Sequence, residues 1–133
     1  MATGSTVDGS ASGGRVQLFA FVKRKEGLTH DEFLAYWHGS HGPLIRDTPG
    51  LADHLLRYEQ HPVHANDRSG YDGVAVQEFE SWDEFVSMLQ GEPGDAMRAD
   101  EANFLSSKDI HVVFTTEPTV MVERPASTAP HPT

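Results

Sequence analysis

The chain contains no cysteine. This absence excludes disulfide bonds, thiolate nucleophiles and zinc sites with cysteine ligands. The chain also opens without the basic region and apolar run of a secretory signal. No stretch of it approaches the roughly 20 apolar residues that cross a bilayer. We therefore expect a soluble, cytoplasmic protein that does not interact with membranes.

Positive charge is scarce. Lys and Arg together number 10 against 20 Asp and Glu, which gives a formal net charge of −10. A nucleic-acid partner needs a basic face for its phosphates, and an anionic membrane surface also attracts basic segments. The balance argues against both partners. It does not indicate a cationic substrate, because excess acidity usually serves solubility.

Motifs for phosphate binding and for a serine nucleophile are also absent. There is no dinucleotide fingerprint, and the glycines of segment 91–94 mark a turn. No Gly-x-Ser-x-Gly elbow occurs. The pairs His38/His41 and His61/His64 have the spacing of metal ligands, but neither has a recognisable third ligand beside it. We expect neither a metal nor a cofactor.

The length of 133 residues suits one domain. Residues 1–14 and 125–133 are low-complexity stretches rich in small residues or proline. Such stretches bury too little apolar surface to offset the entropy lost on ordering. The sequence therefore predicts one domain over residues 15–124 between two flexible tails.

The first half of the domain begins with a strand over 16–23, in which apolar residues alternate on both faces. Thr29 and Glu32 have the spacing of a capping box, which predicts a helix from Thr29. Gly42 and Pro43 are expected to break or kink that helix, and Pro43 to start a further short turn. A second strand is expected over 51–61, ended by Pro62.

In the second half, a third strand is expected over 71–80, and Ser81 caps a second helix. Segment 91–94 interrupts this helix, which resumes over 95–105, and a last strand runs over 110–123. The order β-α-β-β-α-β predicts an α+β, ferredoxin-like fold with a four-stranded antiparallel sheet and both helices on one face. The apolar face left uncovered predicts a homodimer through the sheet faces.

The segment Tyr36-Trp37-His38-Gly39-Ser40-His41-Gly42-Pro43-Leu44 is the most informative in the chain. His41 shares the apolar helical stripe of Phe33 and Trp37. A helix end favours its cation, whereas burial favours its neutral form. Their competition leaves a group suited to acid–base chemistry near neutral pH. The alternative is a packed histidine that caps the helix through a carbonyl.

Motifs along the chain resemble the EthD family. They are Phe33-x-x-Tyr36-Trp37-x-x-x-His41-Gly42-Pro43-Leu44, Arg57-Tyr58-Glu59-Gln60, Tyr71-Asp72-Gly73-Val74 before Phe79, and Ala99-Asp100-Glu101-x-x-Phe104. The resemblance covers about residues 16–123. It implies a dimeric α/β barrel with an apolar pocket. Relatives of this kind include cofactor-free dehydratases, decarboxylases and cyclases of aromatic polyketides, and a muconolactone isomerase.

Candidate catalytic residues follow from these motifs and from the strand pattern. His41 is the first, and Tyr58 is the second because its phenol can donate to a developing enolate. His54 shares the expected strand face of Tyr58, and Asp100 could orient a histidine. Each has a structural alternative: Tyr58 as an ordinary strand aromatic, His54 as a partly exposed histidine, and Asp100 as a helix cap or the ion-pair partner of an arginine. The candidate substrate-binding residues are Tyr36, Trp37, Phe21, Phe104 and His111.

The leading functional hypothesis is a cofactor-free lyase or isomerase for an aromatic or polyketide-like carbonyl compound. His41 would move a proton beside the carbonyl, and an apolar cavity would exclude water. Dehydration, decarboxylation and cyclisation share this enolate chemistry, so the residues leave the choice open. The alternatives are a cofactor-independent monooxygenase of phenols or anthrones and a non-catalytic protein that binds small molecules.

Overall fold

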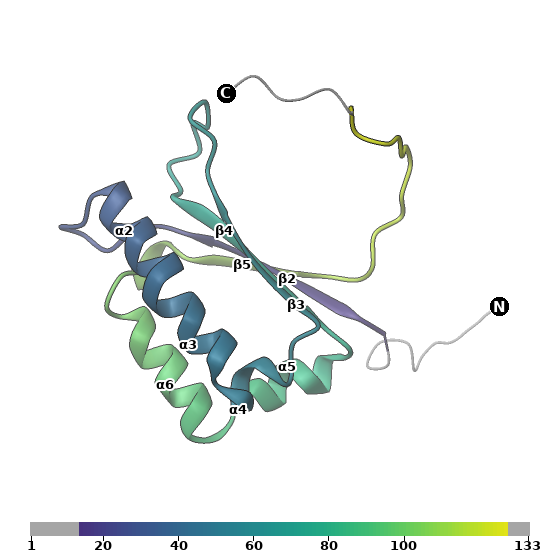
Figure 1. The fold of residues 1–133 in the computed structure, drawn as a ribbon, viewed down its shortest axis with the longest axis horizontal. Helices are drawn as coiled ribbons and strands as arrows, with labels where there is room; N and C mark the ends of the chain where they lie inside the picture. The colour runs from purple at the N-terminus through teal and green to yellow at the C-terminus, as the bar shows by residue number, and fades with distance from the viewer. Residues whose placement is uncertain (1–13, 128–133) are drawn as a thin grey trace.

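The computed structural model describes residues 14–127, which form a sheet covered on one face by helices (Figure 1). The strands are β2 (Val16–Val22), β3 (Arg57–Pro62), β4 (Gly73–Phe79) and β5 (His111–Thr115). They lie in the order β3-β4-β2-β5, and all neighbours are antiparallel. The predicted ferredoxin-like α+β fold is confirmed. The outermost parts of both predicted tails, residues 1–13 and 128–133, lie outside the described residues.

The helical elements connect these strands. The first connection holds α2 (His30–Tyr36), a π-helical turn (Trp37–His41), α3 (Gly42–Asp47) and α4 (Pro49–Ala52). The second holds α5 (Trp82–Met88), α6 (Gly91–Glu101) and a short 3₁₀ turn (Ser107–Asp109). No helix in residues 14–127 is long and apolar enough to cross a membrane.

Both predicted helix starts are present. The Thr29 hydroxyl accepts from the Glu32 amide, and the Glu32 carboxylate accepts from the Thr29 amide, so the capping box is complete. The Ser81 hydroxyl likewise accepts from the amide of Glu84 at the start of α5. These bonds satisfy amides that have no partner within the helix, which explains why the chain turns helical at these points.

The helix is not broken at Gly42 and Pro43, but the prediction that Pro43 starts a further helical turn is confirmed. The chain passes from α2 through the π turn into α3 without leaving helical geometry, and the Gly42 amide donates to the carbonyl of Trp37, five residues back. A wide turn of this kind brings Pro43 to the start of α3, where its missing N–H costs no helical hydrogen bond. His41 therefore lies inside a continuous helical segment, and the dipole of a helix end does not act on it.

Three other boundaries differ from the prediction. Pro49 starts the short helix α4, so residues 49–52 are helical and β3 begins only at Arg57. The predicted interruption of the second helix is present but lies at Leu89 and Gln90, between α5 and α6, and segment 91–94 is the first turn of α6. β5 ends at Thr115, which pairs with Gln17, because β2 starts at Val16 and offers no further partner. The propensities of single residues did not reveal where these helices and strands begin and end, because these boundaries depend on neighbouring elements.

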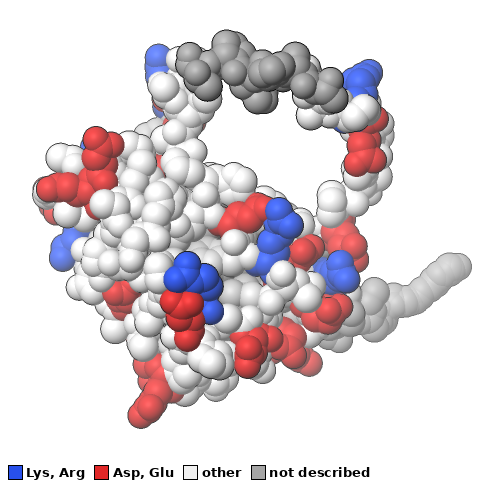
Figure 2. Space-filling model, in the orientation of Figure 1, with Lys and Arg blue, Asp and Glu red and all other residues white. Residues whose placement is uncertain are grey.

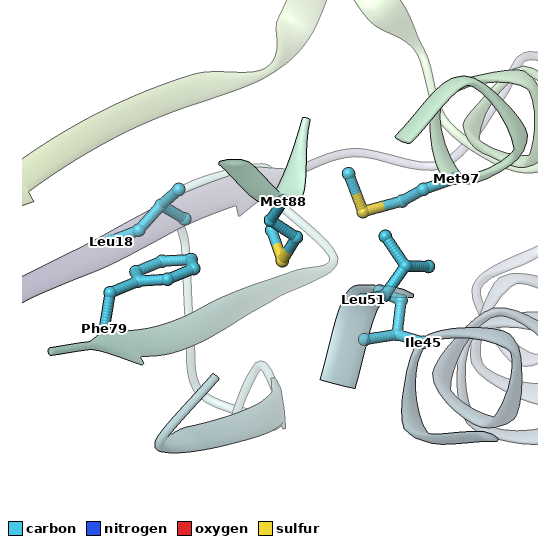
Figure 3. Packing of buried hydrophobic residues seen from close by; sticks show 6 residues of the cluster. All are labelled: Leu18, Ile45, Leu51, Phe79, Met88 and Met97. Carbon is cyan, nitrogen blue, oxygen red and sulfur yellow. The ribbon is translucent and has the colours of Figure 1, made fainter. Parts of the chain in front are cut away.

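The inner face of the sheet carries the core in two clusters. One contains Leu18, Ile45, Leu51, Phe79, Met88 and Met97, whose side chains converge between sheet and helices (Figure 3). The other contains Val22, Phe33, Trp37, Ala75, Phe104 and Leu105. Ala20 and Tyr58 pack against both clusters. The space between the clusters therefore lies beside Tyr58.

The close packing of Trp37 on the sheet explains one glycine. A Cβ atom at Gly73 would lie 2.5 Å from the Trp37 ring and 3.0 Å from the carbonyl oxygen of His61. Only a residue without a side chain admits the indole here. This contact positions the end of α2, and with it the turn that carries His41.

Candidate active site

A cavity of about 370 Å³ lies between the inner face of the sheet and the helices. Its volume falls within the range of small-molecule sites. Most of its walls are apolar, and its polar or charged lining residues are His41, Tyr58, Gln77, Arg98 and Glu101. Val112 and Phe114 of β5 also line it and remain 46% and 40% exposed, so the cavity opens towards that edge of the sheet.

His41 reaches this cavity from the π turn. Its side chain is only 6% exposed, and its ring packs 4.8 Å from that of Phe104. Its Nδ1 atom lies 2.7 Å from Oδ2 of Asp100. Because an ionised carboxylate can only accept, Nδ1–H is the donor, which leaves Nε2 with a free lone pair. The imidazole is therefore held in the tautomer that a general base requires.

Burial lowers the pKa of His41 below its usual value of 6.5. The hydrogen bond and the charge of Asp100 oppose this effect without cancelling it. The neutral imidazole is thus the dominant form at neutral pH. The sequence analysis predicted that a helix end would oppose the effect of burial on the pKa of His41. In the structure the opposing negative charge comes from Asp100 instead.

Asp100 is the centre of a small polar network. Besides His41, it accepts from the Tyr36 hydroxyl at 2.6 Å and from the Asn103 amide at 3.2 Å. Burial alone would raise the pKa of Asp100, but the hydrogen bonds from Tyr36, His41 and Asn103 outweigh it and hold this pKa below its usual value. Neither Asp100 nor Tyr36 lines the cavity. Asp100 and Tyr36 therefore influence His41 through hydrogen bonds from outside the cavity.

Tyr58 belongs to β3 and lines the cavity on that side. Burial raises the pKa of Tyr58 to about 12, against a partly compensating hydrogen bond from Gln60. The Gln60 amide donates to the Tyr58 oxygen at 2.7 Å and to the Trp37 carbonyl at 2.9 Å. No acceptor for the phenol proton occurs in the described part of the chain. Tyr58 is thus a neutral donor, tied by Gln60 to the turn that carries His41.

Three polar or charged lining residues, Gln77, Arg98 and Glu101, were missed by the sequence analysis. Gln77 is 8% exposed and lies opposite Tyr58 in the β3–β4 register. It shares its face with Ala75 and Phe79, so its polarity in an otherwise apolar row was an available signal. Glu101 adjoins Asp100 in the motif around residues 99–101, but its direction depends on how α6 packs.

Besides Asp100 and Tyr36, three further proposed site residues lie away from the cavity. The placement of His54 on a strand with Tyr58 is wrong: His54 lies in the turn before β3, and its Nδ1 contacts Oε1 of Glu84 at 2.8 Å. Phe21 points to the outer face of the sheet, where its ring lies 5.8 Å from that of Tyr71. His111 also contacts Tyr71. Strand alternation puts Phe21 and His111 opposite the cavity.

Of the other residues predicted to bind substrate, Trp37 and Phe104 line the cavity, whereas Tyr36 does not. In residues 14–127 no group of three His, Cys, Asp or Glu side chains is arranged to hold a metal ion. Each histidine of the two sequence pairs has another neighbour: Asp100 for His41, Gln60 for His38, Glu59 for His61 and the Asn66 amide for His64.

Comparison with known proteins adds the following. The family model described as EthD domain matches residues 25–108. No curated protein matches the chain. Among solved structures, an EthD family protein from Bacillus halodurans shares 18% identity at a TM-score of 0.62, covering 78% of this chain and 99% of that one.

Two further structures are similar in fold. A dimeric protein of ferredoxin-like fold from Bacteroides fragilis shares 14% identity at a TM-score of 0.62, over 80% of this chain and 99% of its own. The hydroxynitrile lyase of Passiflora edulis shares 15% identity at a TM-score of 0.60, over 83% of this chain and 99% of its own. Identities this low establish a shared fold, which hosts many functions.

Proposed function

The chain belongs to the EthD family, and we propose that it is a cofactor-free enzyme that moves a proton on an aromatic or polyketide-like carbonyl compound. The reaction class is that of a lyase or isomerase. The observation that carries this proposal is an imidazole held by Asp100 at 2.7 Å on the wall of a mostly apolar cavity. A neutral, oriented histidine beside a mostly apolar cavity is an arrangement suited to general-base catalysis.

In the proposed mechanism, Nε2 of His41 takes a proton from the carbon next to the carbonyl group. Asp100 stabilises the imidazolium that results, as it already accepts from Nδ1. The electron pair moves onto the carbonyl oxygen, which accepts a hydrogen bond from the Tyr58 phenol. Because the pKa of Tyr58 is raised to about 12, this phenol stays a neutral donor throughout the physiological range.

The shape and lining of the cavity favour a ring-containing substrate. Its walls include Trp37 and Phe104 as well as aliphatic side chains, and it holds about 370 Å³. Flat apolar rings bury well against such walls, and polar groups are few enough to fix one orientation. The hydroxynitrile lyase of similar fold supports the view that this architecture accommodates lyase chemistry.

A homodimer is part of the proposal. The outer face of the sheet presents Phe19, Phe21, Val74 and Val76, and Val113 on β5 is 48% exposed. The segment after β5 runs away from the sheet (Figure 1), and its Val120, Met121 and Val122 are 62%, 84% and 67% exposed. Apolar surface of this kind usually marks an interface. Light scattering is expected to give twice the protomer mass of 14.6 kDa.

Charge supports a neutral small-molecule substrate over a polyanion. On the face shown in Figure 2, most basic side chains lie beside acidic ones, and acidic groups are more numerous. With a net charge of −10, the chain would repel a phosphate backbone.

The proposal can be tested without the natural substrate. α-Tetralone, a bicyclic aromatic ketone, is incubated with the protein in deuterated buffer, and exchange at the carbon beside the carbonyl is followed by proton NMR. The wild type is expected to accelerate exchange, and His41→Gln to reduce it by ~100-fold or more. His64→Gln, in an exposed turn, removes an imidazole elsewhere and should retain the wild-type rate.

Two results would contradict the proposal. One is equal exchange by the wild type and His41→Gln. The other is ligand binding with no exchange for any aromatic ketone in a panel, which would leave a binding protein.

A further inference from the structure

Glu101 is a carboxyl group of the cavity that the proton transfer above does not use. It is the last residue of α6 and lines the cavity together with His41 and Tyr58. No hydrogen bond or ion pair involves its carboxyl group within residues 14–127. Asp100, its neighbour in sequence, does not line the cavity and has three donors. The two adjacent carboxyl groups therefore differ in both position and partners.

The surroundings of Glu101 favour its protonated form. Burial raises the pKa of Glu101, the charge of Asp100 adds to this effect, and only the charge of Arg98 opposes it. Arg98 donates to Asp95 at 2.7 Å, and in residues 14–127 its guanidinium makes no hydrogen bond to Glu101. The charge of Glu101 in turn raises the pKa of Tyr58, which indicates that the two groups lie near each other, and both line the cavity. A raised pKa enlarges the protonated fraction of a carboxyl group, and the protonated form can donate a proton.

Gln77 indicates which ligand group the polar side chains of the cavity can bind. Its side chain is almost fully buried and lines the cavity, yet its amide has no hydrogen-bond partner in the described chain. A buried amide without a partner is costly, so a ligand oxygen that satisfies it is strongly favoured. Gln77 lies opposite Tyr58 in the sheet. Tyr58 and Gln77 therefore form a place for one substrate oxygen, and Glu101 can serve a second.

We propose that Glu101 is the general acid that protonates a leaving hydroxyl group, so that the reaction at this site is the dehydration of a β-hydroxy carbonyl compound. The inference rests on the function proposed above. Decarboxylation releases its leaving group without a proton, and simple isomerisation has no leaving group. A protonated carboxyl group beside the base is needed when water is expelled.

The step balances without any further reactant. His41 takes the proton from the carbon beside the carbonyl, and the enolate forms against Tyr58. The enolate then re-forms the carbonyl, a carbon–carbon double bond forms, and the carbon–oxygen bond to the β-hydroxyl breaks. The departing oxygen takes the proton of Glu101 and leaves as water. His41 returns its proton and Glu101 regains one through solvent, so no oxidant or reductant is needed.

A pair of probes separates this step from proton abstraction. The β-hydroxy derivative of α-tetralone loses water to give α-naphthol, which is followed by its fluorescence, whereas α-tetralone only exchanges hydrogen. In Glu101→Gln, the ratio of dehydration to exchange is expected to fall ~100-fold or more, within the range of general-acid contributions. The control Glu92→Gln makes the same chemical change on an exposed residue of the same helix and should preserve the ratio.

The outcomes distinguish the two proposals. Exchange by the wild type with an unchanged ratio in Glu101→Gln would refute the role of Glu101 and leave the proposed function standing. Equal losses of both rates would also refute it, since they indicate damage to the cavity. Absence of exchange by the wild type would overturn the proposed function and this step with it.

A second measurement does not depend on turnover. Carbon NMR of the carboxyl groups, with the Glu101 resonance assigned by its loss in Glu101→Gln, is expected to show a titration midpoint above the usual value of 4.5. A midpoint at or below that value would contradict the inference, because the cavity would then not favour the protonated form that donates.

Discussion

One histidine–aspartate pair lies at the start of the first helical segment and another at its π turn, and their hydrogen bonds have the same length. Nδ1 of His30 lies 2.7 Å from Asp72, and Nδ1 of His41 lies 2.7 Å from Asp100. In the first pair the histidine side chain is 37% exposed and the carboxylate 2% exposed. In the second the histidine is 6% exposed and the carboxylate 17% exposed. The burial is thus reversed between the pairs.

The partners of the two carboxylates differ as well. Asp72 also accepts from the Arg24 amide at 2.8 Å and from its guanidinium at 2.6 Å, so it joins the end of β2 to the start of β4. Asp100 has neutral donors besides His41 and no arginine. A short His–Asp bond therefore does not identify a catalytic pair. What distinguishes His41 is that its own ring is buried against a cavity.

The largest expected effect is a difference in exchange rate between variants of the two histidines. His41→Gln is expected to lower the rate of α-tetralone exchange by ~1,000-fold, because it removes the base. His30→Gln should change that rate less than twofold, because its ring does not line the cavity. Exchange rates under saturating ketone check both. A comparable loss in His30→Gln would mean that the two pairs do not differ in function.

The next effect is on stability and concerns the aspartates. Asp72→Asn is expected to lower the free energy of unfolding by about 3 kcal/mol, because a buried carboxylate that holds Arg24 loses its charge. Asp100→Asn should cost about 1 kcal/mol. Urea unfolding monitored by tryptophan fluorescence gives both values. Equal losses would show that Asp100 is as structural as Asp72.

The stability effect of Asp72 depends on pH in a definite direction. Burial alone would raise the pKa of Asp72, but the hydrogen bonds from Arg24 and His30 outweigh it, so its pKa lies below the ordinary 3.8. A lowered pKa stabilises the fold above that ordinary value and loses its effect as the pH falls through the folded-state pKa. The difference between wild type and Asp72→Asn should therefore be full at neutral pH and shrink below pH 3.8.

A smaller effect concerns the pH dependence of the exchange rate, which reports on His41 and Asp100. Because burial lowers the pKa of His41, the exchange rate should stay constant from neutral pH to below 6.5 before it falls. In Asp100→Asn the interaction that raises this pKa is lost, so the fall should move to lower pH and the plateau should drop about tenfold. A wild-type midpoint above 6.5 would contradict the assignment of His41 as the titrating base.

The smallest effect concerns the residues behind Asp100. Tyr36→Phe removes the phenol that donates to Asp100 at 2.6 Å, which should lower the exchange rate about threefold by loosening His41. Tyr71→Phe removes a phenol on the outer sheet face and serves as the matched control. Because Tyr36 does not line the cavity, the ketone concentration at half-maximal rate should not change. A change confined to that concentration would instead indicate direct contact with the ligand.

Much of the architecture could be predicted from local pattern. The order of the elements, the capping boxes and the stripe that joins Phe33, Trp37 and His41 follow from alternation and helical spacing over a few residues. The predicted helix break at Gly42 and Pro43 was wrong, because a π turn accommodates this proline. The strand position of His54 was wrong because Pro49 starts a helix just before it.

The sequence by itself determined the ferredoxin-like fold and placed His41 on a buried helical stripe, because both depend on periodicities between near neighbours. Only the tertiary structure decided which of several histidines is held beside a cavity. His41 and Asp100 are 59 positions apart, and the packing of α6 against the π turn brings them together. The same packing turns Glu101 towards the cavity and leaves Gln77 beneath it without a partner. Contacts between distant segments depend on the sum of many packing interactions, which no short stretch of sequence encodes.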